Sequence, residues 1–184
     1  MPAEDYWASF FDAHMALRLL MDGETPPDDV VEFGCGYGTF TLPAAERASG
    51  VVTALDIEPD MVAAVRDKAA QLGIDNIRAE MRDFIAQGTG LTDGSQAHAM
   101  VYNLLHLERP VDLLIEARRV LRVGGRLSVM HWRSDIPTPR GPPLAMRPSP
   151  DQCKAWIAEA GFAGSHIVDL RAACPFHFGF IATC

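Results

Sequence analysis

Short apolar segments alternate with helical patterns along most of this chain, and this alternation restricts the possible folds more than any other feature. Nearly continuous apolar strands separated by helices are typical of a parallel sheet with both faces covered. Because strand–helix–strand crossovers are right-handed, the pattern predicts an α/β fold with a doubly wound sheet and helices on both faces. The expected strands are Val30–Phe33, Val51–Asp56, Asn76–Arg82, Ala97–Asn103, Arg126–Trp132, Ser165–Leu170 and Phe176–Thr183.

Three of the expected helices carry end signals. The first has Pro59 in its first turn and Gly73 as its C-terminal cap, and the second, VDLLIEARRVLRVGG, is expected to end at Gly124. The third follows the run SPDQ at 149–152, which has the spacing of a capping box, and is expected to end near Ala160.

Two segments stand outside this alternation. Residues 1–22 are expected to form one leading amphipathic helix, and residues 136–150 contain six prolines. So many prolines exclude a helix interior or a central strand, so the second segment is expected to be a loop. The apolar face of the leading helix consists of Phe10, Ala13, Leu17, Leu20 and Met21.

Length and charge narrow the range of functions. The chain has 184 residues, which suits one domain over 1–184, and its formal net charge is −8. Nucleic-acid binding requires a basic surface, so a small-molecule partner is expected and a nucleic acid is not. No apolar stretch approaches the ~20 residues that cross a bilayer, and acids stand where a secretory signal carries bases. The four cysteines are widely scattered and form no C-x-x-C pair, so neither a disulfide framework nor a structural metal is expected. The expected compartment is therefore a reducing one, the cytoplasm.

A glycine-rich loop directly follows the first strand. In VVEFGCGYGTF, residues 30–40, glycines occupy positions 34, 36 and 38. Glycine adopts backbone angles closed to other residues and lets another molecule lie against the main chain. The loop is therefore either a tight turn or a binding surface. Ligands of doubly wound sheets bind at the carboxyl ends of the strands, where this loop lies, so its position favours binding.

An acid at the end of the second strand supports the binding interpretation. Asp56 follows Gly38 by eighteen positions, where a carboxylate can accept hydrogen bonds from both hydroxyls of a ribose. The loop has the spacing G-x-G-x-G after Glu32, whereas dinucleotide-binding loops have G-x-G-x-x-G. Thr39 stands at the third glycine of that pattern. The spacing therefore disfavours a nicotinamide oxidoreductase.

Five motifs in order resemble those of class I S-adenosylmethionine-dependent methyltransferases. They are E-F-G-C-G-Y-G at 32–38, A-L-D at 54–56, R-D-F at 82–84, Y-N-L-L-H at 102–106 and R-V-L-R-V-G-G at 119–125. The resemblance implies a Rossmann-like sheet of seven mostly parallel strands, S-adenosylmethionine as cofactor, and in-line methyl transfer to a small-molecule acceptor. The chain most resembles the ubiquinone/menaquinone-methyltransferase type, and a monomer or homodimer is expected.

The resemblance also assigns roles to residues. The loop would pass beneath the cofactor and Asp56 would hold the ribose hydroxyls, while Asp83 would accept from the adenine amino group. Asn103 would border the methionine portion and the transferred methyl. His106 lies in the same segment, and it is a candidate general base because histidine titrates in the useful range. The expected cofactor-binding residues are Glu32, Gly34, Gly36, Tyr37, Gly38, Asp56, Ile57, Asp83, Phe84 and Asn103, and the expected catalytic residues are Asn103 and His106.

Several of these residues also have a purely structural interpretation. Ile57 and Phe84, expected beside the adenine ring, fit a core position equally well, and Asp83 fits a loop cap. His106 fits a histidine with satisfied hydrogen bonds at a helix entry. Asp56 is the firmest assignment, because an acid that ends a buried strand needs a partner.

The remaining candidates concern the acceptor side. His131 and Trp132, which end the fifth strand, are further substrate-facing candidates. Aromatic faces steady a methyl sulfonium cation, and the candidates for this are Tyr6, Trp7 and Tyr37. We expect residues 1–22 and 136–150 to form an acceptor lid together. The alternative is that the leading helix covers core.

Some positions depart from the family pattern. The fourth strand begins with Ala97-His98 where many relatives have Phe-Asp, and Val123 replaces a proline. No Pro-Pro-aromatic run follows position 103, so the chain does not resemble amino-methylating nucleic-acid enzymes. Cys174 and Cys184 are expected at opposite ends of one strand, too far apart to share a metal at ~3.3 Å per residue. A module that binds the cofactor without transferring methyl is the alternative function.

Overall fold

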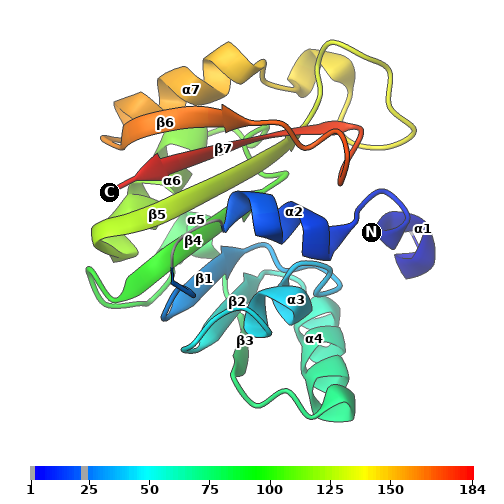
Figure 1. Cartoon of the computed structure of the whole chain (residues 1–184), viewed down its shortest axis with the longest axis vertical. Coiled ribbons are helices and arrows are strands. Elements are labelled where there is room, and N and C mark those ends of the chain that lie inside the picture. Colours follow the sequence, from blue (N-terminus) through cyan, green and yellow to red (C-terminus); the bar gives the residue numbers. More distant parts are fainter. Residues whose placement is uncertain (1–2, 22–24) are drawn as a thin grey trace.

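The computed structural model describes residues 3–21 and 25–184 and contains one seven-stranded sheet with the strand order β3-β2-β1-β4-β5-β7-β6 (Figure 1). The first five strands pair in parallel, and β7 runs antiparallel to both of its neighbours. The doubly wound, mostly parallel sheet expected from the sequence is thus confirmed. The strands are β1 (Val30–Phe33), β2 (Val52–Asp56), β3 (Ile77–Met81), β4 (Gln96–Tyr102), β5 (Leu121–Trp132), β6 (Ala163–Val168) and β7 (His177–Thr183).

Helices cover both faces of the sheet, as expected (Figure 1). The buried side chains of α2 (Ala13–Leu20), α3 (Thr41–Ala45) and α4 (Pro59–Leu72) pack on one face. Those of α6 (Pro110–Val120) and α7 (Pro150–Glu159) pack on the other, where the short α5 (Phe84–Gln87) also lies. Two segments lie outside these layers, namely α1 (Glu4–Ala8), which buries none of its residues, and the 3₁₀ turn η1 (Leu144–Met146).

Two of the three expected helix ends are confirmed. α4 begins at Pro59 and is capped by Gly73 in the left-handed conformation, with φ 67°. α7 follows a complete capping box, in which the Ser149 side chain accepts from the Gln152 N–H. The expected end of the middle helix at Gly124 is wrong, because α6 ends at Val120 and Leu121 already pairs with β4.

The expected single leading helix is also wrong, because the chain breaks between α1 and α2. Asp12 leaves helical geometry, with φ −89° and ψ 90°, and its side chain caps α2 by accepting from the Met15 N–H at 2.9 Å. The Asp12 N–H donates instead to the Ala173 carbonyl at 2.8 Å. Leu17 and Leu20 are fully buried, so α2 belongs to the core and only α1 remains available as a lid. Residues 1, 2 and 22 of the expected helix lie outside the described residues.

The proline-rich segment 136–150 is fixed against the end of β5 by one arginine. Arg147 is 8% exposed and donates to three backbone carbonyls, those of Arg133, Arg140 and Pro142, at 2.7 to 3.1 Å. Its guanidinium also lies 5.9 Å from the centre of the Trp132 ring. These contacts hold the segment in place beside Trp132.

Candidate functional site

A cavity of about 510 Å³ opens at the carboxyl ends of β1, β2 and β4. This is the edge at which ligands of doubly wound sheets bind. Residues from four separate sequence motifs meet in its wall. The expected site residues that line it are Gly34, Gly36, Asp56, Ile57, Asp83, Phe84 and Asn103.

The glycine loop and the end of β2 are joined by hydrogen bonds through Asp56. Its Oδ2 accepts from the Gly36 N–H at 2.8 Å, and its Oδ1 accepts from the Glu58 N–H at 3.0 Å. Gly34 has φ 73°, and a Cβ there would lie 3.3 Å from the Leu104 side chain, so both conformation and space favour glycine. A carboxylate offers about four acceptor sites, so two remain on Asp56 for a ligand in the cavity.

Glu32 lies behind the loop, because it is buried and does not line the cavity. It accepts a hydrogen bond from the Thr41 hydroxyl. Burial raises the pKa of Glu32 to about 8, against the effect of the Thr41 hydrogen bond, and the nearby Asp56 charge raises it further. Glu32 is therefore protonated at neutral pH, and it supports the glycine loop from the side opposite the cavity.

Apolar side chains and one acid form the end of the cavity beyond β2. Ile57 is 56% exposed and Ile85 is 49% exposed, although both line the cavity. Phe84 is partly buried, and its ring meets that of Phe33 edge-on at 5.4 Å. Asp83 caps α5 by accepting from the Ala86 N–H at 2.9 Å, so the structural interpretation of this residue is correct and it also faces the cavity.

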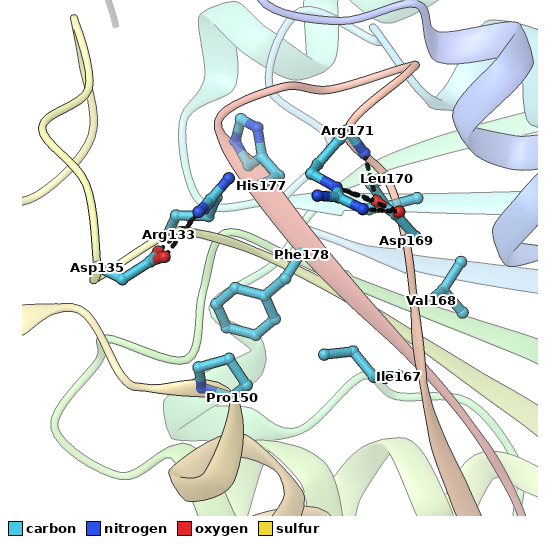
Figure 2. A pocket seen from close by; sticks show the side chains of 10 residues that line it. All are labelled: Arg133, Asp135, Pro150, Ile167, Val168, Asp169, Leu170, Arg171, His177 and Phe178. Atoms are coloured by element: carbon cyan, nitrogen blue, oxygen red, sulfur yellow. Dashed lines mark hydrogen bonds and ion pairs between the residues drawn. The ribbon is translucent and has the colours of Figure 1, made fainter.

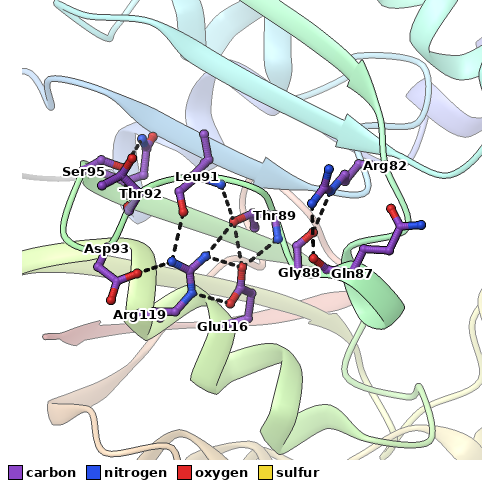
Figure 3. A network of polar contacts seen from close by, with 11 residues as sticks. Arg82, Gln87, Gly88, Thr89, Leu91, Thr92, Asp93, Ser95, Glu116 and Arg119 are labelled. Carbon is purple, nitrogen blue, oxygen red and sulfur yellow. Dashed lines mark hydrogen bonds and ion pairs between the residues drawn. The ribbon is translucent and has the colours of Figure 1, made fainter.

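A polar network ties this end of the cavity to α6 (Figure 3). Glu116 accepts from the Thr89 N–H at 2.6 Å and from the Arg119 guanidinium at 2.7 Å. Burial opposes the charge on Glu116, but the hydrogen bonds from Arg119 and Thr89 lower its pKa to about 2. Arg82 donates to the Gly88 carbonyl at 2.9 Å in the same region. The segment that carries Asp83 is therefore anchored at both ends.

Asn103 lies where β4 gives way to a turn, and its side chain has an unused acceptor. It is the only non-glycine residue with positive φ, 59°, among those that the structure describes. Its N–H donates to the Met130 carbonyl at 2.7 Å, but its Oδ1 is buried and has no partner in the described part of the chain. Strained backbone and an orphaned acceptor each cost about 1–3 kcal/mol. Both occur at a cavity wall, where a ligand donor can reach.

The expected acceptor-side residues are only partly brought together. His106 does not line the cavity; it is half-buried in the turn after β4. His131 and Trp132 are buried and do not line the cavity. Trp7 of α1 does line the cavity, and its ring meets that of Trp132 at 6.1 Å.

The other expected residues lie away from the cavity. Tyr37 and Gly38 line a shallow groove between α1 and α4, and the Tyr37 carbonyl accepts from Lys68 at 2.7 Å. Tyr6 is exposed and meets Phe10 edge-on. Five further lining residues were not predicted from the sequence, although they flank the quoted motifs or lie within them. They are Arg82, Ile85, Tyr102, Leu104 and Leu107.

A second cavity, of about 360 Å³, lies beyond β5 at the same edge of the sheet (Figure 2). Phe178, Ile167 and Pro150 form its apolar wall. Two ion pairs stand at its rim, Arg133–Asp135 and Arg171–Asp169, each with a closest contact of 2.6 Å.

Neither a metal-binding cluster nor a membrane-spanning helix is present among the described residues. No group of three or more His, Cys, Asp or Glu residues in that part of the chain is arranged to hold a metal ion. None of the described helices is long and apolar enough to span a membrane.

Comparison with known proteins gives a family match over the glycine loop and the sheet. The family described as "Methyltransferase domain" matches residues 30–125. Aklanonic acid methyltransferase DauC of Streptomyces sp. (strain C5) is 32% identical over 120 residues, 60% of this chain and 52% of that protein. Ribosomal RNA small subunit methyltransferase A of Corynebacterium efficiens is 33% identical over 119 residues, 58% of this chain and 41% of that protein. The chain thus spans about half the length of these relatives, or less.

Solved structures share the fold at low sequence identity. A SAM dependent methyltransferase from Aquifex aeolicus has a TM-score of 0.80 at 21% identity, over 95% of this chain and 90% of that chain. Geranyl diphosphate methyltransferase in complex with SAM has a TM-score of 0.76 at 17% identity, over 100% of this chain and 92% of that chain. The agreement shows that the seven-stranded Rossmann-like architecture is shared.

Proposed function

Because this chain belongs to the methyltransferase domain family, we propose that it transfers a methyl group from S-adenosylmethionine to a small-molecule acceptor. The observation that carries the proposal is the position of Asp56. Its carboxylate anchors the glycine loop and keeps acceptor sites free at the wall of the cavity. A ribose with two adjacent hydroxyls supplies two donors for those sites.

The other lining groups suit the remaining parts of this cofactor. Ile57 and Phe84 would pack against the adenine ring. Asp83 uses one carboxylate oxygen to cap α5, and its other oxygen would accept a hydrogen bond from the adenine amino group. The orphaned Oδ1 of Asn103 suits a donor such as the ammonium of the methionine portion. Glycines 34 and 36 leave room for the ligand to lie against the backbone.

When bound, S-adenosylmethionine supplies a methyl group on a sulfonium sulfur, which keeps the bonding electron pair as the methyl leaves. The task of this chain is then alignment, which can contribute about 7–11 kcal/mol to lowering a barrier. Trp7 would exclude water at the mouth and offer an aromatic face to a cation. His106 would act as a general base beside the acceptor, and Asn103 would orient the methyl region.

A small-molecule acceptor is supported by charge and by one relative. The net charge of −8 opposes a polyanion, although the relatives include a ribosomal RNA methyltransferase. One relative is named as a methyltransferase of aklanonic acid, which is a small molecule. Our narrower proposal is a quinone-type acceptor methylated by a cytoplasmic monomer or homodimer. The cavity beyond β5 offers apolar space for such a ring (Figure 2).

Calorimetric titration tests the cofactor. We expect saturable binding of S-adenosylmethionine and S-adenosylhomocysteine, and no binding of NAD. Saturable NAD binding with no response to either sulfur ligand would contradict the proposal. Transfer itself is tested by incubation with pools of quinols, phenols, carboxylic acids and amines, with S-adenosylhomocysteine as the measured product. RNA oligonucleotides serve as the comparison, and methylated RNA without any methylated small molecule would refute the acceptor class.

A further inference from the structure

Two histidines form a hydrogen-bonded pair beside the cavity. His131, at the end of β5, is fully buried, and His106 lies in the turn that follows β4. His106 Nδ1 is 3.3 Å from His131 Nε2, and the ring centres are 5.5 Å apart. His131 Nδ1 is in turn 3.1 Å from the carbonyl oxygen of Trp132. The three groups form a chain that starts at a backbone carbonyl and ends at His106.

The Trp132 carbonyl determines where the protons of this chain lie. A carbonyl oxygen only accepts hydrogen bonds, so His131 Nδ1 carries the proton. A neutral imidazole with its proton on Nδ1 has an electron pair on Nε2, so His131 accepts from His106. His106 Nδ1 must then carry the donated proton, which leaves the electron pair of His106 on Nε2. That Nε2 has no partner among the residues that the structure describes, and it is not an enclosed atom.

The surroundings keep both rings neutral. Burial lowers the pKa of His131 to about 4 despite the hydrogen bond to the Trp132 carbonyl, and the nearby His106 and Arg147 disfavour a positive charge on His131 further. Burial also lowers the pKa of His106 from its ordinary value. His177, on the neighbouring strand β7, has its pKa lowered to about 3 by burial and by His131 and Arg147. No carboxylate in the described part of the chain forms an ion pair with His106 or His131.

We propose that His131 is a positioning residue that holds His106 in the tautomer whose Nε2 electron pair points away from the pair, toward the methyl acceptor. This inference rests on the proposed transferase function. The turn that carries His106 also carries Leu104 and Leu107, and both of these line the cofactor cavity. His106 does not line the cavity itself, but it lies in the turn between two residues that do.

The assignment restricts the acceptor to a molecule whose methylated atom carries a proton. That proton forms a bond to His106 Nε2, and the acceptor atom keeps the electron pair of the broken bond. The same pair makes the new bond to the methyl carbon. His106 becomes an imidazolium that still donates from Nδ1 to His131, and its Nε2 proton then passes to solvent. Because His106 is a weak base without a carboxylate partner, acceptors with an acidic hydroxyl, such as a phenol or an enol, fit best.

Nitrogen NMR of the histidine side chains tests the tautomer without any acceptor. Long-range ¹H–¹⁵N spectra of labelled protein distinguish a protonated Nδ1 from a protonated Nε2, and His106→Gln assigns the signals of His106. We expect both His106 and His131 to carry the proton on Nδ1 at mildly alkaline pH. A His106 with its proton on Nε2 in the unaltered protein would overturn the proposal, whether or not any variant folds.

Two substitutions at position 131 separate positioning from packing. His131→Phe removes the acceptor and should convert His106 to a mixture with Nε2–H, whereas His131→Gln offers an amide oxygen and should restore Nδ1–H. Equal His106 spectra in both variants would also overturn the proposal. His98, which bonds Ser128 at 2.8 Å elsewhere in the core, is the internal control for folding. Binding of S-adenosylmethionine, measured on the same samples, reports separately on the proposed function.

Discussion

The carboxylate of Asp56 accepts a hydrogen bond from the Gly36 N–H at 2.8 Å, across twenty positions of sequence. One side chain therefore fixes the glycine loop to the end of β2 and faces the cavity as well. Asp56 can perform both roles at once, because its two backbone hydrogen bonds leave other acceptor sites on the carboxylate. Loop geometry and ligand affinity are thus coupled through one residue.

Asp56→Ala should weaken S-adenosylmethionine binding by at least tenfold. Each hydrogen bond to a charged acceptor contributes about 1.5–3 kcal/mol, and the substitution removes the pair expected from the ribose. Calorimetry measures the loss. Asp60→Ala, in the exposed first turn of α4, is the matched control and should bind normally. Unchanged affinity in Asp56→Ala would mean that the ribose lies elsewhere.

Glu32 should make the protein less stable as the pH rises from about 5 to about 8. Its pKa is raised in the folded state to about 8 from its ordinary value of 4.5, so between these values the folded protein binds more protons than the unfolded chain. Stability then falls with increasing pH, and the loss is complete above the folded-state value. The total is on the order of a few kcal/mol.

Glu32→Gln tests this, because glutamine mimics the protonated acid and keeps an acceptor for Thr41. The difference in unfolding free energy between the variant and the unaltered protein should grow in favour of the variant as pH rises. Urea unfolding at a series of pH values measures it. Taking the difference cancels the buried histidines, whose lowered pKa values act in the opposite direction. A difference that does not change with pH would contradict the assignment.

Local sequence signals predicted most of the strands and most of the residues that line the cavity at the ends of β1, β2 and β4. Strand periodicity and the cap at Gly73 are short-range features, and Asp56 is the only charged residue of a strand that is otherwise apolar except for Thr53. The predictions failed where a long-range contact decides the local structure. The break at Asp12 depends on the Ala173 carbonyl, and the early end of α6 depends on pairing of Leu121 with Gln96.

The acceptor side was harder to predict for the same reason. The sequence indicated His106 and His131 separately, but their contact joins β4 to β5 and follows only from the register of those strands. Burial of Trp132 likewise depends on Phe10 and Trp7, which come from the other end of the chain. No periodicity carries such information.

Asn103→Gly should stabilise the fold and impair ligand binding. Glycine adopts φ 59° freely, which relieves about 1–3 kcal/mol of strain, and the substitution removes the orphaned Oδ1. The same atom is the one proposed to accept from the methionine portion. Asn103→Ala also removes the orphan, but alanine adopts a positive φ less readily than asparagine, so this variant should be less stable than Asn103→Gly while binding as weakly. Thermal unfolding and calorimetry measure both properties. Stronger binding by Asn103→Gly would exclude Oδ1 as a ligand contact.

The last prediction separates α1 from α2. Removal of residues 1–8 takes away α1, which buries no residue, whereas removal of residues 1–21 also takes away Leu17 and Leu20 from the core. The shorter deletion should leave a cooperatively folded protein whose cofactor affinity is reduced several-fold, because Trp7 leaves the cavity wall. The longer deletion should lose the cooperative transition, since burying each leucine contributes about 1.5–3 kcal/mol.

Circular dichroism melts and calorimetry distinguish these outcomes, and Trp7→Ala in the full chain isolates the contribution of the ring. Lys68→Ala is the companion variant, because Lys68 pairs with Glu4 of α1 and also donates to the Tyr37 carbonyl. If α1 closes over the ligand, Lys68→Ala should weaken binding in the full chain and have a smaller effect in the chain that lacks residues 1–8. Equal effects in both backgrounds would show that Lys68 acts through the glycine loop alone, and α1 would then not be a lid.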